Sequence, residues 1–115
     1  MRLGDLGANV IKVERPGEGD GARVYGPPFL KDMQGRSTNH SPMYLSANRS
    51  KKGIAIDLKH PGGIALAKRM IATADVVMES FRPGVMTRLG LGYDDASLGV
   101  AGLTIYTTID KDAQD

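Results

Sequence analysis

Short apolar runs alternate with polar stretches along this chain and predict four β-strands. The runs are residues 8–14, 53–58, 75–79 and 103–108. Short runs of this kind, rich in β-branched side chains and bounded by turn residues, are typical of buried strands. The residues before the first run look like the end of a helix, with Gly7 in the left-handed conformation that terminates it.

A helical pattern separates the second run from the third. Pro61 is expected to open this helix, and apolar side chains then recur at helical spacing. The apolar positions are Ile64, Leu66, Ala67, Met70, Ile71 and Ala74. A strand, a helix and a strand in this order predict a βαβ unit with parallel pairing and a right-handed crossover. The fold class we expect is therefore α/β, with a mostly parallel sheet and flanking helices.

Residues 15–48 interrupt this alternation, because the segment is rich in Gly, Pro, Asp, Ser and Asn. A loop of this length inside a compact domain is uncommon unless it has a function. We therefore expect a long excursion that forms a functional surface or becomes ordered against another molecule, with residues 24–25 and 43–45 as short apolar anchors. Further along, residues 85–89 predict a single helical turn and residues 93–98 a short helix.

The composition limits the classes of function. The chain has 115 residues, a length typical of one domain, and no Cys, which excludes disulfides, thiol catalysis and thiolate metal sites. No apolar run approaches the roughly 18 residues that a membrane-spanning helix needs, and the first residues lack the pattern of a signal peptide. We therefore expect a cytoplasmic protein that contacts no membrane.

The charge pattern favours a small anionic partner. The formal net charge is only +2, but residues 49–88 contain eight basic and three acidic side chains, and residues 110–115 form an acidic tail. Nucleic-acid binding requires many phosphate contacts. A modest local surplus therefore indicates a partner with a few negative charges and not a nucleic acid.

Basic residues follow three of the four predicted strands. Arg15, Lys59 and Arg82 come at or just after the strand ends, and Arg88 lies a turn or two beyond Arg82. Ligands of open parallel sheets bind outside the carboxyl ends of the strands. These cations would therefore line one crevice if the strands are neighbours, and guanidinium groups match phosphates in geometry. The alternative is that polar residues simply accumulate where strands end.

Other motifs indicate little chemistry. The Gly-rich residues 17–21 include two acids and open no helix, so they do not match a dinucleotide-phosphate loop. His40 and His60 have no second ligand at metal-binding spacing, and we expect no metal site. Asp57 is expected to cap the helix that begins near Pro61 and not to act alone as an acid or base.

Several motifs, taken in order, resemble the family III coenzyme A (CoA) transferases, the group that includes formyl-CoA transferase, carnitine CoA-transferase and α-methylacyl-CoA racemase. The motifs are GANVIKVERPG at residues 7–17, GDGAR at 19–23, NRSKKGIAIDLK at 48–59, ADVVMESFRPGV at 74–85 and LGLGY at 89–93. The resemblance extends from Gly7 to about Ile109 and covers most of this chain.

This resemblance implies a Rossmann-like, CoA-binding N-terminal portion of a longer polypeptide that forms an interlocked homodimer. In the family, CoA lies along the carboxyl ends of the strands. The matching positions are Arg15, Ile56, Asp57, Leu58, Lys59, Ser80, Phe81, Arg82 and Arg88. The four cations would neutralise the phosphates of CoA, and Phe81 or Ile56 would face its adenine. Ser80 stands where the family usually has Asn.

The same resemblance limits the catalysis expected of these residues. The transferases use an aspartate nucleophile, which forms a mixed anhydride and then a CoA thioester, and the racemases use a His and an Asp. Neither set matches a residue here, so we assign no catalytic residue. We expect the chain to hold CoA, the acyl carrier, for a parent enzyme that transfers CoA between carboxylic acids.

Three alternatives stay open from the sequence. The chain is a racemase-like segment, a non-catalytic binding or assembly module, or the product of a reading frame that shifts near residue 98. In each case the sheet lacks its first strand relative to the family. We expect the exposed edge to favour self-association.

Overall fold

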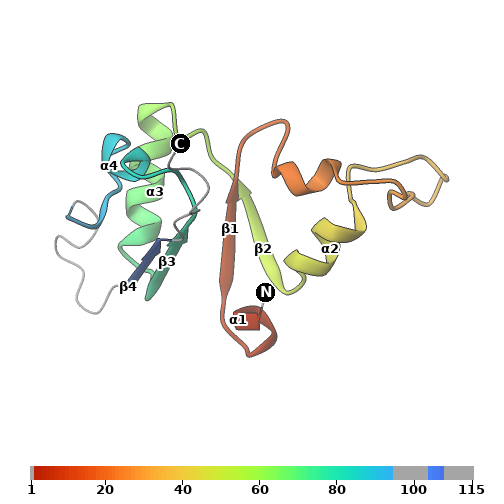
Figure 1. Cartoon of the computed structure of the whole chain (residues 1–115), viewed down its shortest axis with the longest axis horizontal. Helices are drawn as coiled ribbons and strands as arrows, with labels where there is room; N and C mark the ends of the chain where they lie inside the picture. Colours follow the sequence, from red (N-terminus) through yellow and green to blue (C-terminus); the bar gives the residue numbers. More distant parts are fainter. Residues whose placement is uncertain (1, 95–103, 108–115) are drawn as a thin grey trace. The chain divides into compact units, whose positions relative to one another are not determined.

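The computed structural model describes residues 2–94 and 104–107 (Figure 1). The chain divides into two compact units, Met1–Ile56 and Asp57–Asp115. The elements are α1 (Arg2–Asp5), β1 (Val10–Glu14), the 3-10 helix η1 (Gly21–Val24), α2 (Pro42–Asn48), β2 (Lys51–Ala55), α3 (Pro61–Ile71), β3 (Val76–Glu79), α4 (Val85–Arg88) and β4 (Thr104–Thr107). Helices and parallel strand pairs together confirm the α/β class.

Strands β1 and β2 form the parallel pair of the first unit. The register runs from Val10 opposite Lys51 to Glu14 opposite Ala55. In Figure 1 the two arrows lie side by side and point the same way. Strand β1 confirms the first predicted strand, and β2 begins two residues before the second predicted strand.

Helix α1 ends as the sequence predicts. Gly7 has a φ of +94°, a conformation that most L side chains avoid. Its amide donates to the carbonyl of Gly4 at 3.1 Å, and the amide of Ala8 donates to the carbonyl of Leu3 at 2.9 Å. These bonds satisfy the last carbonyls of the helix and direct the chain into β1.

The segment between β1 and β2 is more ordered than the long loop predicted for residues 15–48. Parallel strands run in the same direction, so the chain must return by a crossover, which usually contains a helix. This crossover contains η1, α2 and an antiparallel bridge between Lys31 and Ser37. Neither helix was predicted, and the description of the segment as a long loop is corrected in this respect.

Helix α2 begins at a buried serine. The Ser41 side chain is fully buried, and its Oγ accepts a hydrogen bond from the amide of Tyr44 at 3.1 Å. The same hydroxyl donates to the carbonyl of Ala22 at 2.6 Å. A serine cap followed by Pro42 is a strong start signal for a helix. The cap also ties α2 to η1.

Helix α3 in the second unit matches the predicted helical pattern. It spans Pro61–Ile71, and Ala67 on its apolar face is 8% exposed. The N-cap is His60, whose Nδ1 accepts from the amide of Gly62 at 3.0 Å. The expected cap, Asp57, instead accepts from the amide of Lys59 at 2.9 Å and closes the preceding turn. A carboxylate reaches an amide two residues ahead more readily than one five residues ahead.

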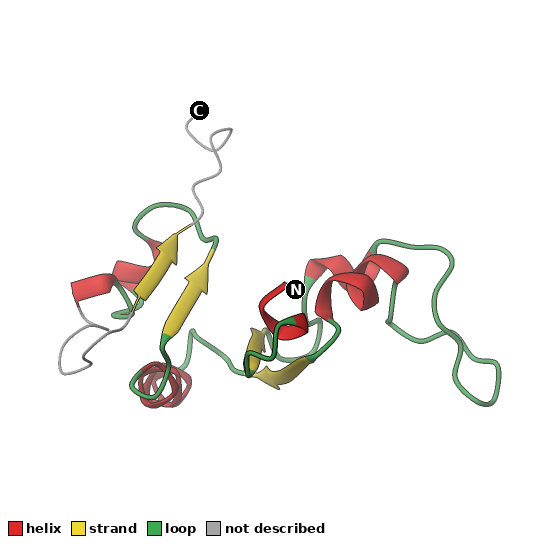
Figure 2. Cartoon of the chain, turned by 90° about the horizontal axis from the view of Figure 1, so that it is seen from below, coloured by secondary structure: helices red, strands yellow, loops and turns green. Residues whose placement is uncertain are grey.

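The described residues contain two parallel pairs, β1 with β2 in the first unit and β3 with β4 in the second, and both are drawn in yellow in Figure 2. The pairing predicted across α3 would join β2 to β3, which belong to different units, so it stays a prediction. An apolar run predicts a strand, but it carries no information on which neighbouring edge the strand will join.

Of the apolar anchors predicted in the crossover, Tyr44 is half-buried and hydrogen-bonded to Glu14 of β1, whereas the others are exposed. Val24 is 73% exposed, Tyr25 64% and Met43 56%, whereas the buried apolar side chains are Ile56, Ala67 and Leu91. None of the described helices has the length and apolar character required to cross a membrane. Most of the helix predicted at residues 93–98 and the acidic tail at 110–115 lie outside the described residues.

The Ser41 cap gives a test of how the crossover is held. We expect Ser41→Ala to lower the free energy of unfolding by roughly 1–2 kcal/mol, because it removes a helix cap and one of the two hydrogen bonds that the Ala22 carbonyl accepts. Urea unfolding followed by circular dichroism measures this change. The matched control is Ser46→Ala on the exposed side of α2, which should be nearly neutral. Equal effects of the two substitutions would contradict this role of Ser41.

Candidate functional site

The predicted site residues follow the strands as expected. Arg15 directly follows β1, residues 57–59 come after β2, residues 80–82 come after β3, and Arg88 ends α4. They are distributed over both units, since Arg15 and Ile56 belong to the first unit and the others to the second. The structure defines their surroundings within each unit, and the shared crevice stays a prediction.

The two apolar side chains considered for adenine binding differ in exposure. Ile56 is 5% exposed, and its amide donates to the carbonyl of Glu14 at 3.0 Å. Phe81 is 43% exposed, and its amide donates to the carboxylate of Glu79 at 2.8 Å. Phe81 is therefore the more accessible apolar surface. Ser80 beside it is exposed, and Leu58 is half-buried.

Arg82 and Arg88 lie at the two ends of one short turn. The carbonyl of Arg82 accepts from the amide of Val85 at 3.1 Å, and the amide of Arg88 donates to the carbonyl of Gly84 at 3.0 Å. A Cβ atom at Gly84 would lie 3.6 Å from Nη1 of Arg88, so this guanidinium group lies over the turn. Two guanidinium groups are thus held on a single segment after β3.

Three of the four cations of the candidate site have no acidic partner within the described residues, unlike several other cations of the chain. The ion pairs of the described chain that involve other cations are Lys12–Asp20, Arg23–Glu14, Arg36–Asp32 and Arg49–Asp5. Among the described residues no ion pair involves Lys59, Arg82 or Arg88, and Arg15 has only the exposed Glu18 at 3.6 Å. An exposed pair of this kind contributes little.

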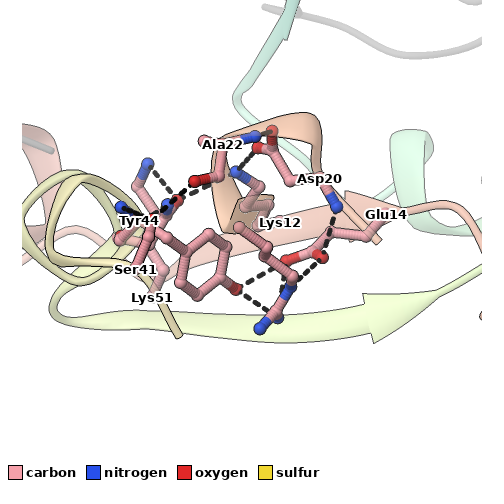
Figure 3. Close-up of polar contacts among 9 residues, drawn as sticks. Lys12, Glu14, Asp20, Ala22, Ser41, Tyr44 and Lys51 are labelled. Carbon is pink, nitrogen blue, oxygen red and sulfur yellow. Dashed lines mark hydrogen bonds and ion pairs between the residues drawn. The ribbon is translucent and has the colours of Figure 1, made fainter. Parts of the chain in front are cut away.

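A polar cluster that the sequence did not predict surrounds Glu14 (Figure 3). We call it the Glu14 network, and its members are Lys12, Glu14, Asp20, Arg23, His40, Tyr44 and Asn48. Lys12 and Glu14 are two residues apart on β1 and therefore project from the same face of the strand. The other members come from the crossover between β1 and β2. The network therefore joins the crossover to the strand.

The Glu14 carboxylate has four hydrogen-bond donors. Its Oε1 accepts from the hydroxyl of Tyr44 at 2.6 Å and from Nη2 of Arg23 at 3.2 Å. Its Oε2 accepts from Nε of Arg23 and from the amide of Asp20, both at 3.0 Å. The Glu14 side chain is 8% exposed and that of Arg23 17%. Two parallel bonds to one guanidinium group give the pair a defined geometry.

Tyr44 and Arg23 also contact each other directly. Nη2 of Arg23 donates to the Tyr44 hydroxyl at 2.6 Å, and the guanidinium carbon lies 3.8 Å from the centre of the ring. This is a cation–π contact in addition to a hydrogen bond. Nη1 of Arg23 lies 3.1 Å from Nδ1 of His40. Arg23 thus links η1 to β1, to α2 and to the residue before the α2 cap.

Lys12 extends the network toward the start of β2. Its ammonium group is paired with the carboxylate of Asp20 and donates to Oδ1 of Asn48 at 3.0 Å. The same oxygen accepts from Nζ of Lys51 at 3.2 Å. Asn48, the last residue of α2, therefore joins a cation of β1 to a cation of β2.

The hydrogen bonds of the network shift the pKa values of its acids. The bond from Arg23, with those from Tyr44 and the Asp20 amide, lowers the pKa of Glu14 from 4.5 to about 2 against the opposing effect of burial. The amide of Ala22, followed by Lys12, lowers the pKa of Asp20. Burial, followed by the bond to Glu14, raises the pKa of Tyr44. Both acids are therefore held as carboxylates.

The network was missed because its members are far apart in the sequence. Tyr44 is 30 residues from Glu14, and Asn48 is 36 residues from Lys12. The available signals were the pair Ser41 and Pro42, which marks a helix start, and the acidic residues in the Gly-rich segment at 17–21. No group of three His, Cys, Asp or Glu side chains in the described part of the chain is placed to hold a metal ion.

Comparison with known proteins shows the family to which this chain belongs. A family model described as CoA-transferase family III matches residues 1–107. The chain belongs to this family, as its motifs indicate.

Individual relatives agree with this assignment. The chain is 47% identical over 109 residues to succinyl-CoA:glutarate CoA-transferase of Homo sapiens, covering 95% of this chain and 23% of the relative. It is 45% identical over 94 residues to acetyl-CoA:oxalate CoA-transferase of Acetobacter aceti, covering 81% of this chain and 22% of the relative. The chain thus spans about a quarter of the length of the curated relatives it matches.

A solved structure has the same fold. The crystal structure of a CAIB/BAIF family protein from Brucella suis superposes with a TM-score of 0.81 at 39% identity, covering 91% of this chain and 27% of that one. The orthorhombic crystal structure of Rv3272 from M. tuberculosis gives a TM-score of 0.79 at 39% identity, covering 93% of this chain and 27% of that one.

The lowered pKa of Glu14 predicts the acid stability of the protein. Because the folded pKa lies near 2 and the unfolded pKa near 4.5, the carboxylate stabilises the fold fully above pH 4.5 and loses this effect as the pH falls toward 2. We expect a loss of roughly 2–3 kcal/mol over this window. Glu14→Gln removes the carboxylate, so this variant should be less stable than the wild-type protein already at pH 7. The free energies of unfolding of the two proteins should become similar as the pH falls.

Urea unfolding at pH 7, 4.5 and 3 measures this convergence. Glu18→Gln is the matched control, because it neutralises a carboxylate that is 85% exposed. A constant difference between the wild-type protein and Glu14→Gln at all three pH values would contradict the assignment.

Proposed function

We propose that this chain is the CoA-binding N-terminal segment of a family III CoA-transferase, a cytoplasmic and homodimeric enzyme that transfers CoA between carboxylic acids. The observation that carries the proposal is a group of cations at or shortly after the strand ends that have no strong ion pair within the described residues, namely Arg15, Lys59, Arg82 and Arg88. Membership of the family supports it, because the relatives named above are CoA-transferases.

The chemistry of CoA fits these side chains. CoA carries a 3′-phosphate and a diphosphate, and guanidinium groups bind phosphate oxygens through two parallel hydrogen bonds. The two guanidinium groups on the turn after β3 suit one phosphate group, with Arg15 and Lys59 as further cations. The exposed ring of Phe81 offers a surface on which adenine can stack. Ile56, Asp57, Leu58 and Ser80 complete the proposed contacts through the segments that follow β2 and β3.

The acyl-transfer step requires a nucleophile supplied from elsewhere in the protein. In the mechanism that the resemblance implies, a carboxylate attacks the thioester carbonyl and releases CoA as its thiolate, leaving a mixed anhydride. The thiolate then attacks the carbonyl carbon of the enzyme's carboxyl group, which releases the donor acid and forms an enzyme–CoA thioester. The acceptor carboxylate displaces CoA from this thioester to give a second anhydride, from which the CoA thiolate takes the new acyl group and restores the carboxylate. No residue of this chain is proposed for that role. The part proposed for these residues is to bind and orient CoA, which places its thioester for reaction.

Calorimetric titration of CoA tests the binding proposal. We expect the 115-residue chain to bind CoA, and Arg82→Ala to raise the Kd at least about tenfold, because it removes a charge-assisted hydrogen bond to phosphate. The matched control is Arg69→Ala on α3, which removes the same charge away from the strand ends and should change the Kd by less than about twofold. Failure of the unsubstituted chain to bind CoA would favour the non-catalytic assembly module.

A second measurement tests the division of roles. We expect the purified chain to show no exchange of acyl groups between an acyl-CoA and a free carboxylic acid, since the nucleophile is assigned elsewhere. Chromatographic separation of the thioesters measures this exchange. Turnover by the 115-residue chain would contradict the assignment of these residues to binding alone.

A further inference from the structure

Arg15 is the first residue of a turn, residues 15–19, whose two ends are joined by hydrogen bonds. The carbonyl of Arg15 accepts from the amide of Gly19 at 3.2 Å. One residue further on, the amide of Asp20 donates to Oε2 of Glu14 at 3.0 Å. The Glu14 side chain therefore bridges the turn: it holds Asp20, the residue after the turn, close to Glu14, the residue before it. The other three donors to this carboxylate, the Tyr44 hydroxyl and two guanidinium nitrogens of Arg23, hold it in place.

Among the described residues, the Arg15 side chain has one weak ion-pair partner, Glu18. Its ion pair with Glu18 is long, at 3.6 Å, and the two side chains are 72% and 85% exposed. An exposed pair of this kind contributes at most about 1 kcal/mol. The direction in which the guanidinium group leaves the protein therefore depends on the backbone of the turn.

Gly19 is the position at which the turn and the network meet. A Cβ atom there would lie 2.6 Å from Oε2 of Glu14 and 2.9 Å from Nε of Arg23. Both side chains are mostly buried and hydrogen-bonded to each other, so a methyl group would separate them. Gly17 in the same turn also has a positive φ, yet nothing lies within 4 Å of a Cβ atom there.

We propose that Glu14 and Gly19 are positioning residues for Arg15: the Glu14 network holds the turn from which the Arg15 guanidinium group binds a phosphate of CoA. This inference rests on the proposed function, because it takes CoA as the ligand. Beyond that function, the inference assigns to Glu14 and Gly19 an effect on the affinity for CoA, which they exert through Arg15. It also gives a function to the Gly-rich segment at 17–21, which does not form a phosphate loop itself.

A matched pair of glycine substitutions tests the proposal. Gly19→Ala and Gly17→Ala both place a side chain at a positive φ, so they share the same backbone cost. Only Gly19→Ala displaces the Glu14–Arg23 pair. In calorimetric titration of CoA into the full 115-residue chain, we expect Gly19→Ala to raise the Kd at least about fivefold. Gly17→Ala should change it by less than about twofold.

A double-substitution cycle separates positioning from a general loss of stability. If Gly19 acts through Arg15, Gly19→Ala should leave the Kd of the Arg15→Ala protein unchanged. Tyr44→Phe provides a milder second variant, since it keeps the ring and removes only the hydroxyl that donates to Glu14. We expect it to raise the Kd about two- to threefold, again only when Arg15 is present.

The outcomes distinguish this inference from the function on which it rests. If the unsubstituted chain binds CoA but the two glycine variants weaken binding equally, the positioning role is wrong. The same conclusion follows if the effects of Gly19→Ala and Arg15→Ala simply add. If the unsubstituted chain does not bind CoA, the proposed function is wrong and the positioning role with it.

Discussion

The parallel pairing of β1 with β2 is the constraint on which the first unit depends. Parallel strands cannot be joined by a tight turn, so the chain must cross from the end of one to the start of the next. A crossover of this length has a high conformational entropy that its contacts must offset. Glu14 supplies several of these contacts, because its carboxylate binds Arg23 of η1, Tyr44 of α2 and the amide of Asp20.

Carboxylates pair with only some of the basic residues of the described chain. Lys12, Arg23 and Arg49 have acidic partners within the first unit and so serve the fold. The cations that follow the strands have none in the described chain, apart from the exposed pair of Arg15. The basic residues counted between positions 49 and 88 therefore differ in their surroundings: Arg49 is paired with Asp5 of α1, whereas Arg82 and Arg88 have no ion pair within the described residues and are the ones proposed to bind CoA.

Local features of the fold could be predicted from the sequence, and long-range pairing could not. The β-branched run before Glu14 and the apolar spacing from Ile64 to Ile71 each have one structural interpretation, and both were confirmed. Helix α2 was missed because its seven residues are too few for an apolar pattern at helical spacing to be recognised, although Ser41 and Pro42 mark its start. The Glu14 network could not be predicted, since its geometry depends on contacts between residues about 30 positions apart.

The anchoring of the crossover also determines where the chain tolerates changes in length. Arg23 and Tyr44 hold its two ends against β1, and the bridge between Lys31 and Ser37 lies between these anchors. A residue inserted or deleted inside the bridge therefore leaves both anchors in place. Doubling a loop costs only about 0.6 kcal/mol in closure entropy. The tip of the crossover can vary while the strand pair and the Arg15 turn keep their geometry.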